Sequence, residues 1–198
     1  MKGSFIILSF FAGGLLAGIF SLLPGFLLEN DYSLYALYIL MFLVGIGIGS
    51  NKKSIEIIKS FNLKIVLVPL SVIIGTYIGV AIFTLLQNNL SLIDSIAIGS
   101  GFGYYSLSSV LISEISGEQL GVIALLSNII REIITLLFTP IFAKYFGKLA
   151  PISSGGATSM DTCLPVITKY IGAEYAIISV FSGIVLTILI PFLITIIL

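Results

Sequence analysis

The chain has 198 residues, of which 58% are hydrophobic and only 9% are charged. Roughly a quarter of the residues in a soluble domain are charged, and a chain of this length must still expose a large surface, so we infer that lipid covers most of it. The nine basic and nine acidic residues cancel, which leaves no basic patch for nucleic acid. Histidine is absent, which excludes histidine-based metal sites, proton shuttles and catalytic nucleophiles.

These limits predict an all-α integral membrane protein that crosses the cell (inner or plasma) membrane several times, with the lipid bilayer as its main partner. We expect no enzymatic activity and no catalytic residue, cofactor or metal site. The single cysteine, Cys163, cannot form an internal disulfide.

Five apolar segments are long enough to cross the hydrocarbon core, which takes about 20 helical residues. The run from Phe5 to Leu28 is too long for the apolar part of a signal peptide, so we interpret it as the first span. GxxxG spacings at Gly14/Gly18 and Gly75/Gly79 are typical of close helix contacts, although such matches often arise by chance in glycine-rich spans. The five predicted spans are 4–28, 33–49, 65–86, 119–143 and 174–198.

Two further apolar segments, 95–113 and 150–172, are interrupted by glycine, serine and proline. Each glycine costs a helix about 1 kcal/mol relative to alanine, and non-helical backbone at membrane depth survives only inside protein or beside a cavity. In transporters, such breaks indicate a binding site. We therefore predict about five full transmembrane helices and two interrupted or re-entrant segments, in a single transmembrane transporter domain over residues 1–198.

Positive charges predict the topology, because loops rich in lysine stay in the cytoplasm. The connection 50–64 is such a loop, and Lys144 and Lys148 also favour the cytoplasm. Both regions lie inside if 95–113 is re-entrant from the outer face, which leaves Leu198 outside. If 95–113 crosses fully, Lys144 and Lys148 fall on the outer side, so we favour the re-entrant arrangement. The lysines of the first loop are Lys52, Lys53, Lys59 and Lys64.

Three acidic residues lie in or beside apolar segments, where charge is expensive and usually functional. They are Glu132, Asp161 and Glu114. Each also has a plain structural interpretation. Glu132 and its neighbour Arg131 could form an ion pair, although adjacent helical residues do not face each other. Asp161 could be the N-cap of the helix that follows, and Glu114 could end a helix in water.

The interrupted segments resemble those of the bacterial lysine exporter family LysO. The resemblance rests on the string from Ser100 to Ser108 continuing to Glu114, on Asn128 to Glu132, and on GGATSMD at 155–161 followed by Leu164-Pro165. The sequence FLVG at 42–45, before the lysine-bearing loop, is similar as well. This resemblance covers nearly the whole chain.

The resemblance implies export of L-lysine and its toxic analogues, with Glu132 and Asp161 as the important acids. We expect these carboxylates to bind the ε-ammonium and a proton in turn. Backbone N–H groups at the breaks are expected to hold the α-carboxylate. Arg131 either helps there or acts as a built-in cation when the site is empty. The other predicted substrate- or ion-binding residues are Glu114, Asn128, Gly155, Gly156, Thr158, Ser159, Gly101, Gly103, Tyr105 and Ser106.

Energetics favour exchange over simple efflux. Moving a cation out of a negative interior costs about 2.3 kcal/mol per charge per 100 mV, and an entering proton cancels that charge. Two alternatives remain: a sodium-coupled carrier of organic anions, and a non-transporting membrane subunit. The family's familiar chains carry further spans at the N-terminal side, so we also expect a small separate membrane subunit or a homo-oligomer.

Overall fold

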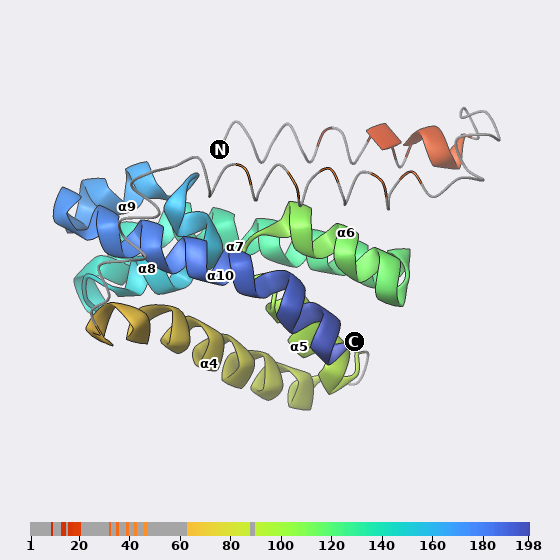
Figure 1. Cartoon of the computed structure of the whole chain (residues 1–198), viewed down its shortest axis with the longest axis horizontal. Coiled ribbons are helices and arrows are strands. Elements are labelled where there is room, and N and C mark those ends of the chain that lie inside the picture. Colours follow the sequence, from red (N-terminus) through yellow and green to blue (C-terminus); the bar gives the residue numbers. More distant parts are fainter. Residues whose placement is uncertain are drawn as a thin grey trace.

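The computed structural model describes residues 63–87 and 90–198, together with positions 9, 13, 14, 16–20, 32, 35, 39, 42 and 46. Within this part of the chain every element is a helix (Figure 1). Apart from those single positions, the predicted spans 4–28 and 33–49 lie outside the described residues, and so does the predicted loop 50–64 up to residue 62. The long helices are α4 (Leu63–Leu86), α7 (Glu118–Tyr145) and α10 (Ala176–Ile197).

Three stretches are long and apolar enough to cross a membrane: Ile65–Leu86, Glu118–Tyr145 and Ala173–Ile197. They match the predicted spans 65–86, 119–143 and 174–198 to within a few residues. Only 17% of the first apolar window is buried, against 44% of the last. Helix α4 therefore lies at the periphery of the described bundle, and α10 lies inside it.

The first interrupted segment folds as a hairpin of two short helices, α5 (Leu92–Gly99) and α6 (Tyr105–Ser116). Helix α5 runs from one end of the bundle toward its middle, and α6 returns to the same end, where Gly117 turns the chain into α7 (Figure 1). The chain thus enters and leaves this segment at one end, as the re-entrant interpretation of 95–113 requires. Its placement relative to the two membrane faces stays a prediction.

The second interrupted segment forms an opposing hairpin. It comprises α8 (Ala150–Gly155), the 3₁₀ helix η2 (Gly156–Met160) and α9 (Leu164–Ile171), and the short η3 (Ala173–Tyr175) leads into α10. Its open end lies at the other end of the bundle, where Lys148 and Glu174 approach to 4.0 Å (Figure 1). Both side chains are well exposed, so this ion pair contributes little stability.

The tips of the two hairpins meet in the middle of the bundle, between α4, α7 and α10. A buried apolar cluster surrounds the contact and includes Phe102 and Leu107 from the first hairpin, Ala157 from the second, and Leu186 and Ile190 from α10. Burial of this cluster stabilises the contact by about 25 cal/mol per Å² of apolar surface.

The GxxxG spacing does not mark a helix contact in the described structure. A Cβ atom added at Gly75 or Gly79 would meet nothing within 4 Å, and the same holds at Gly14 and Gly18. Close approaches occur instead at glycines of the hairpin tips, at Gly121 on α7, and at Gly183 on α10, where an added Cβ would lie 2.5 Å from the Cβ of Met160.

Candidate functional site

A single backbone hydrogen bond joins the two hairpin tips. The N–H of Ala157 donates to the carbonyl oxygen of Phe102 over 2.9 Å. Gly156 has φ +60°, and a Cβ there would collide with the same Phe102 carbonyl. A Cβ on Gly103, at φ +93°, would lie 3.0 Å from the Gly155 carbonyl oxygen. Gly103 and Gly156, two of the four predicted site glycines, are therefore required by close backbone contact and by their positive φ.

Asn128 on α7 holds the tip of the first hairpin. Its Oδ1 accepts a hydrogen bond from the N–H of Gly103 over 2.7 Å, and its Nδ2 donates to the carbonyls of Ile98 and Ala124. The side chain is only 3% exposed. A Cβ on Gly101 would lie 2.6 Å from Nδ2, so this glycine leaves room for the amide. Asn128 thus binds the Gly103 N–H, which the break between α5 and α6 leaves without a helical partner.

Arg131, one turn further along α7, holds the second hairpin. Its Nε donates to the carbonyl of Ser154 over 2.9 Å, and one terminal nitrogen donates to the carbonyl of Ser153. The other terminal nitrogen donates to the hydroxyl of Thr76 on α4 over 3.2 Å. A cation at the C-terminal end of α8 suits the negative end of the helix dipole. In this structure the guanidinium is occupied by protein groups, so a role for Arg131 in binding the α-carboxylate has no direct support.

Glu132 lies on the polar, buried face of α7 and is 0% exposed. Its carboxylate is close enough to the buried thiol of Cys163 to interact with it electrostatically, and the carboxylate of Asp161 is as well. The two acids that the sequence singles out are therefore both within electrostatic range of one cysteine at the second tip. Thr135 continues the same face and shares a 2.7 Å hydrogen bond with the hydroxyl of Ser154.

Thr158 and Ser159 shape the second tip from within. The hydroxyl of Thr158 donates to the carbonyl of Gly155 over 2.9 Å and lies 3.4 Å from the sulfur of Cys163. Ser159 donates to the carbonyl of Ser179 on α10, and the hydroxyl of Ser179 donates back to the carbonyl of Ser159. Both predicted site residues are buried and bind their own chain.

Asp161 is exposed, in contrast to Glu132. The interpretation of Asp161 as the N-cap of the next helix is wrong, because α9 begins at Leu164 and its N-cap is Cys163. The Asp161 carboxylate instead accepts hydrogen bonds from the N–H and the hydroxyl of its neighbour Thr162. Asp161 itself follows the last residue of η2, so the break in the segment leaves its carboxylate accessible.

The accessible residues of the two tips form a small set. At the first tip Tyr104 and Ser106 keep partial exposure, whereas Phe102, Gly103 and Tyr105 are buried. At the second tip Met160 is partly exposed, and Asp161 and Thr162 are exposed. Sequence reasoning included Ser106 and Asp161 but missed Tyr104, which stands in the string 100–108 that carries the family resemblance, and Thr162, which directly follows GGATSMD.

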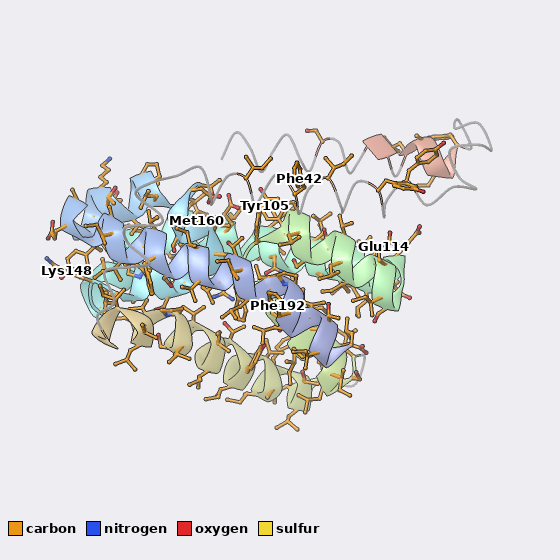
Figure 2. All side chains as sticks on the ribbon, viewed as in Figure 1. Phe42, Tyr105, Glu114, Lys148, Met160 and Phe192 are labelled. Atoms are coloured by element: carbon orange, nitrogen blue, oxygen red, sulfur yellow. The ribbon has the colours of Figure 1, made fainter. Side chains whose placement is uncertain are left out.

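Tyr105 is buried rather than accessible, at 6% exposure, and packs with Leu125 and Ile129 of α7. Its backbone nevertheless lies at the tip, and Figure 2 shows Tyr105 and Met160 near the middle of the molecule.

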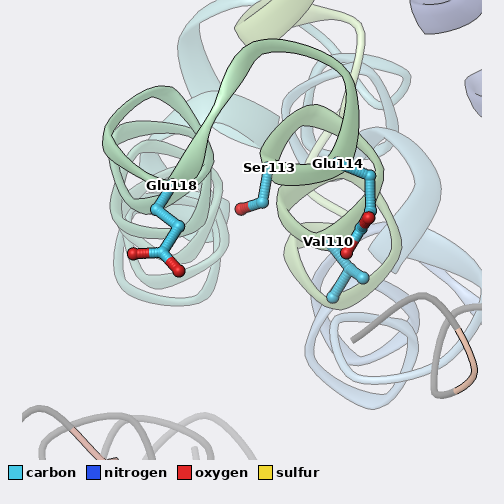
Figure 3. Close-up of a pocket in the computed structure, with 4 residues that line it drawn as sticks. All are labelled: Val110, Ser113, Glu114 and Glu118. Carbon is cyan, nitrogen blue, oxygen red and sulfur yellow. The ribbon is translucent and has the colours of Figure 1, made fainter. Parts of the chain in front are cut away.

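Glu114 is not part of the tip region. It lies at the far end of α6, near one extremity of the molecule (Figure 2). There it lines an open cavity of about 360 Å³ with Val110, Ser113 and Glu118 (Figure 3). The structure thus separates Glu114 from Glu132 and Asp161, in agreement with the plain interpretation of an exposed helix end.

Comparison with known proteins agrees with the motifs. A family model described as "Lysine exporter LysO" matches residues 8–198. The chain belongs to the lysine exporter LysO family. It is 35% identical over 167 residues to a "Putative lysine exporter" of Haemophilus influenzae, covering 83% of each chain. It is 33% identical over 165 residues to "Lysine exporter LysO" of Escherichia coli, covering 83% of this chain but 54% of that one. No solved structure matches.

Relatives in the LysO family thus differ in length, since the match spans about half of the Escherichia coli protein and most of the Haemophilus influenzae protein. The expectation of a longer chain, drawn from the family's familiar members, is therefore not met by every relative. The partner subunit or homo-oligomer that it suggested stays a prediction.

Proposed function

We propose that this protein exports L-lysine across the cell membrane in exchange for protons. The observation that carries the proposal is the match of the LysO family model over residues 8–198, which includes both hairpins and both acids. The arrangement of the hairpins supports transport as well, since broken helices that meet at mid-bundle are how transporters place irregular backbone beside a substrate path.

In the proposed mechanism the two acids have different tasks. Asp161 is exposed at the tip and receives the ε-ammonium of lysine first. Glu132 is fully buried on α7 and binds and releases the proton that is exchanged for lysine. In this proposal a proton and the substrate cation compete for these two carboxylates. This competition links the outward step of lysine to the inward step of a proton.

The hydrogen bonds at the tips support these separate roles of Asp161 and Glu132. Asn128 and Arg131 hold the two hairpins on α7, and the Phe102–Ala157 bond joins them. The carboxylate of Asp161 then has a fixed position relative to Glu132, which efficient transfer of a cation requires. In this proposal both Asn128 and Arg131 are positioning residues.

The test is counterflow of labelled lysine in liposomes that contain the purified protein. We expect unlabelled lysine inside to accelerate uptake of labelled lysine, and an opposing proton gradient to drive net efflux. Arginine, ornithine and sodium serve as competitors. Dependence on sodium would favour the sodium-coupled alternative, and absence of any lysine movement would favour a non-transporting subunit.

A separate arm tests the coupling alone. Counterflow at equal pH on both sides would confirm that lysine is a substrate. If net efflux of lysine then moves no protons, proton antiport is excluded. The variant Glu132→Gln, which cannot release a proton, is expected to retain counterflow better than net proton-driven efflux.

A further inference from the structure

Tyr104 stands at the point where the first hairpin reaches the second. Its backbone is fixed by three hydrogen bonds: its N–H donates to the carbonyl of Gly101 over 2.7 Å, and its own carbonyl accepts from the N–H and the hydroxyl of Ser108. The turn between α5 and α6 therefore fixes the position of the Tyr104 backbone, from which the phenol side chain extends. Tyr104 keeps partial exposure, although the residues on either side of it are buried.

Asp161 reaches the same place from the second hairpin. The residue before Tyr104, Gly103, lies against Thr158, because a Cβ on that glycine would be 3.5 Å from the Thr158 hydroxyl oxygen. The N–H of Asp161 in turn donates to the carbonyl of Thr158 over 3.3 Å. Tyr104 and Asp161 therefore lie at the same junction of the two tips, and both side chains keep some exposure there.

The chemistry of the pair suits one class of ligand. A carboxylate attracts an ammonium group, and the face of an aromatic ring attracts the same cation through its quadrupole. The other polar groups that face the tips from within, such as Asn128 and Ser159, bind their own chain. Among the accessible residues of the described tips, Tyr104 and Asp161 supply the aromatic ring and the carboxylate that suit a cationic side chain.

We propose that Tyr104 is a specificity-determining residue that, together with Asp161, binds the ε-ammonium of the exported amino acid. The inference rests on the proposed function and deepens it: Asp161 supplies the charge, and the ring of Tyr104 selects a cation over a neutral side chain of the same length. The two residues come from opposing hairpins, so the site exists only while the tips are in contact.

The experiment compares Tyr104→Phe and Tyr104→Ala in the lysine counterflow assay. The phenylalanine variant keeps the ring face and should transport lysine within about threefold of the normal KM. The alanine variant should raise the KM for lysine about 3- to 30-fold, which is the range of a cation–π contact. Inhibition by norleucine, which has the same chain without the ε-ammonium, should stay unchanged in both variants.

Two controls separate binding from folding. Tyr145→Ala removes an exposed tyrosine at the far end of α7 and should leave the KM unchanged. If Tyr104→Ala does not insert, Tyr104→Leu keeps an apolar side chain without a ring and should show the same rise in KM. A purely structural role for Tyr104 would lower the amount of active protein and leave the ratio of lysine to norleucine affinity as it was.

The outcomes separate the proposed role of Tyr104 from the proposed export of lysine. If the unmodified protein transports lysine and the alanine and leucine variants keep the normal KM and selectivity, the role of Tyr104 is refuted while lysine export stands. If the unmodified protein moves no lysine, the proposed function fails first, and the assignment of Tyr104 to an ε-ammonium fails with it.

Discussion

The carbonyl oxygen of Phe102 accepts a 2.9 Å hydrogen bond from the N–H of Ala157, and this bond joins two hairpins that enter the bundle from opposite ends. Phe102 reaches that position in a left-handed conformation, with φ 44°, and is completely buried. A bulky residue rarely adopts this conformation without support from its surroundings. The packing around Phe102 therefore maintains a contact on which the proposed site depends.

Gly156→Ala should break the contact between the tips. The new Cβ would collide with the Phe102 carbonyl, in addition to the cost of a left-handed alanine, which is about 1 kcal/mol. We expect loss of lysine transport and a lower melting temperature in detergent. Gly147→Ala is a matched control, because Gly147 has φ +92° but nothing within 4 Å of the added Cβ. Equal effects at both positions would mean that backbone strain alone matters.

Gly183→Ala should push η2 away from α10. An added Cβ would lie 2.8 Å from the carbonyl oxygen of Ala157 and 2.5 Å from the Cβ of Met160. Overpacking of this kind costs about 1–3 kcal/mol. We expect a lower melting temperature together with reduced transport. Gly79→Ala, on the open face of α4, makes the same change without a neighbour and should keep both properties.

Asp161→Asn preserves shape and removes the charge at the accessible tip. We expect lysine transport to fall at least about tenfold, or about 1.4 kcal/mol, while insertion and melting temperature stay normal. Glu114→Gln is the matched control, since Glu114 lies at the far end of α6 and should leave transport unchanged. Normal transport by Asp161→Asn would remove this residue from the coupling mechanism.

Asn128→Asp should destabilise the first hairpin. A carboxylate cannot donate to the carbonyls of Ile98 and Ala124, so two buried acceptors would face a buried negative charge. We expect a loss of stability of about 1–3 kcal/mol, measured as a lower midpoint of thermal unfolding in detergent. If Asn128→Asp unfolds at the normal temperature, the amide does not hold the hairpin as the hydrogen bonds indicate.

Cysteine labelling tests the proposed membrane placement of the hairpins. In a Cys163→Ala background, Phe146→Cys at one end of α7 should be protected from an impermeant external reagent. Ser116→Cys, at the opposite end beside Gly117, should be labelled. Both positions are exposed in the bundle, so access depends on the membrane face. The reverse pattern would show that the lysine-based orientation is wrong.

The amino-acid sequence by itself determined the class of the protein and the position of its helices and breaks. The length of each apolar run fixes which helices can span lipid, and glycine and proline fix where they stop, because both properties act within a few residues. The segments 65–86, 119–143 and 174–198 were predicted for this reason, and so were the interruptions near Gly101 and Gly156. Family motifs likewise depend only on the order of residues.

Only the tertiary structure decided which of these residues meet. Glu114, Glu132 and Asp161 look alike as acids beside apolar runs, yet one lies at a helix end, one is fully buried and one is exposed at the tip. Accessibility and contact between distant segments depend on how the hairpins pack on α7 and α10, and no local pattern encodes that packing. The same packing turned Arg131 toward the carbonyls of Ser153 and Ser154 and brought Tyr104 and Asp161 to the same junction of the two tips.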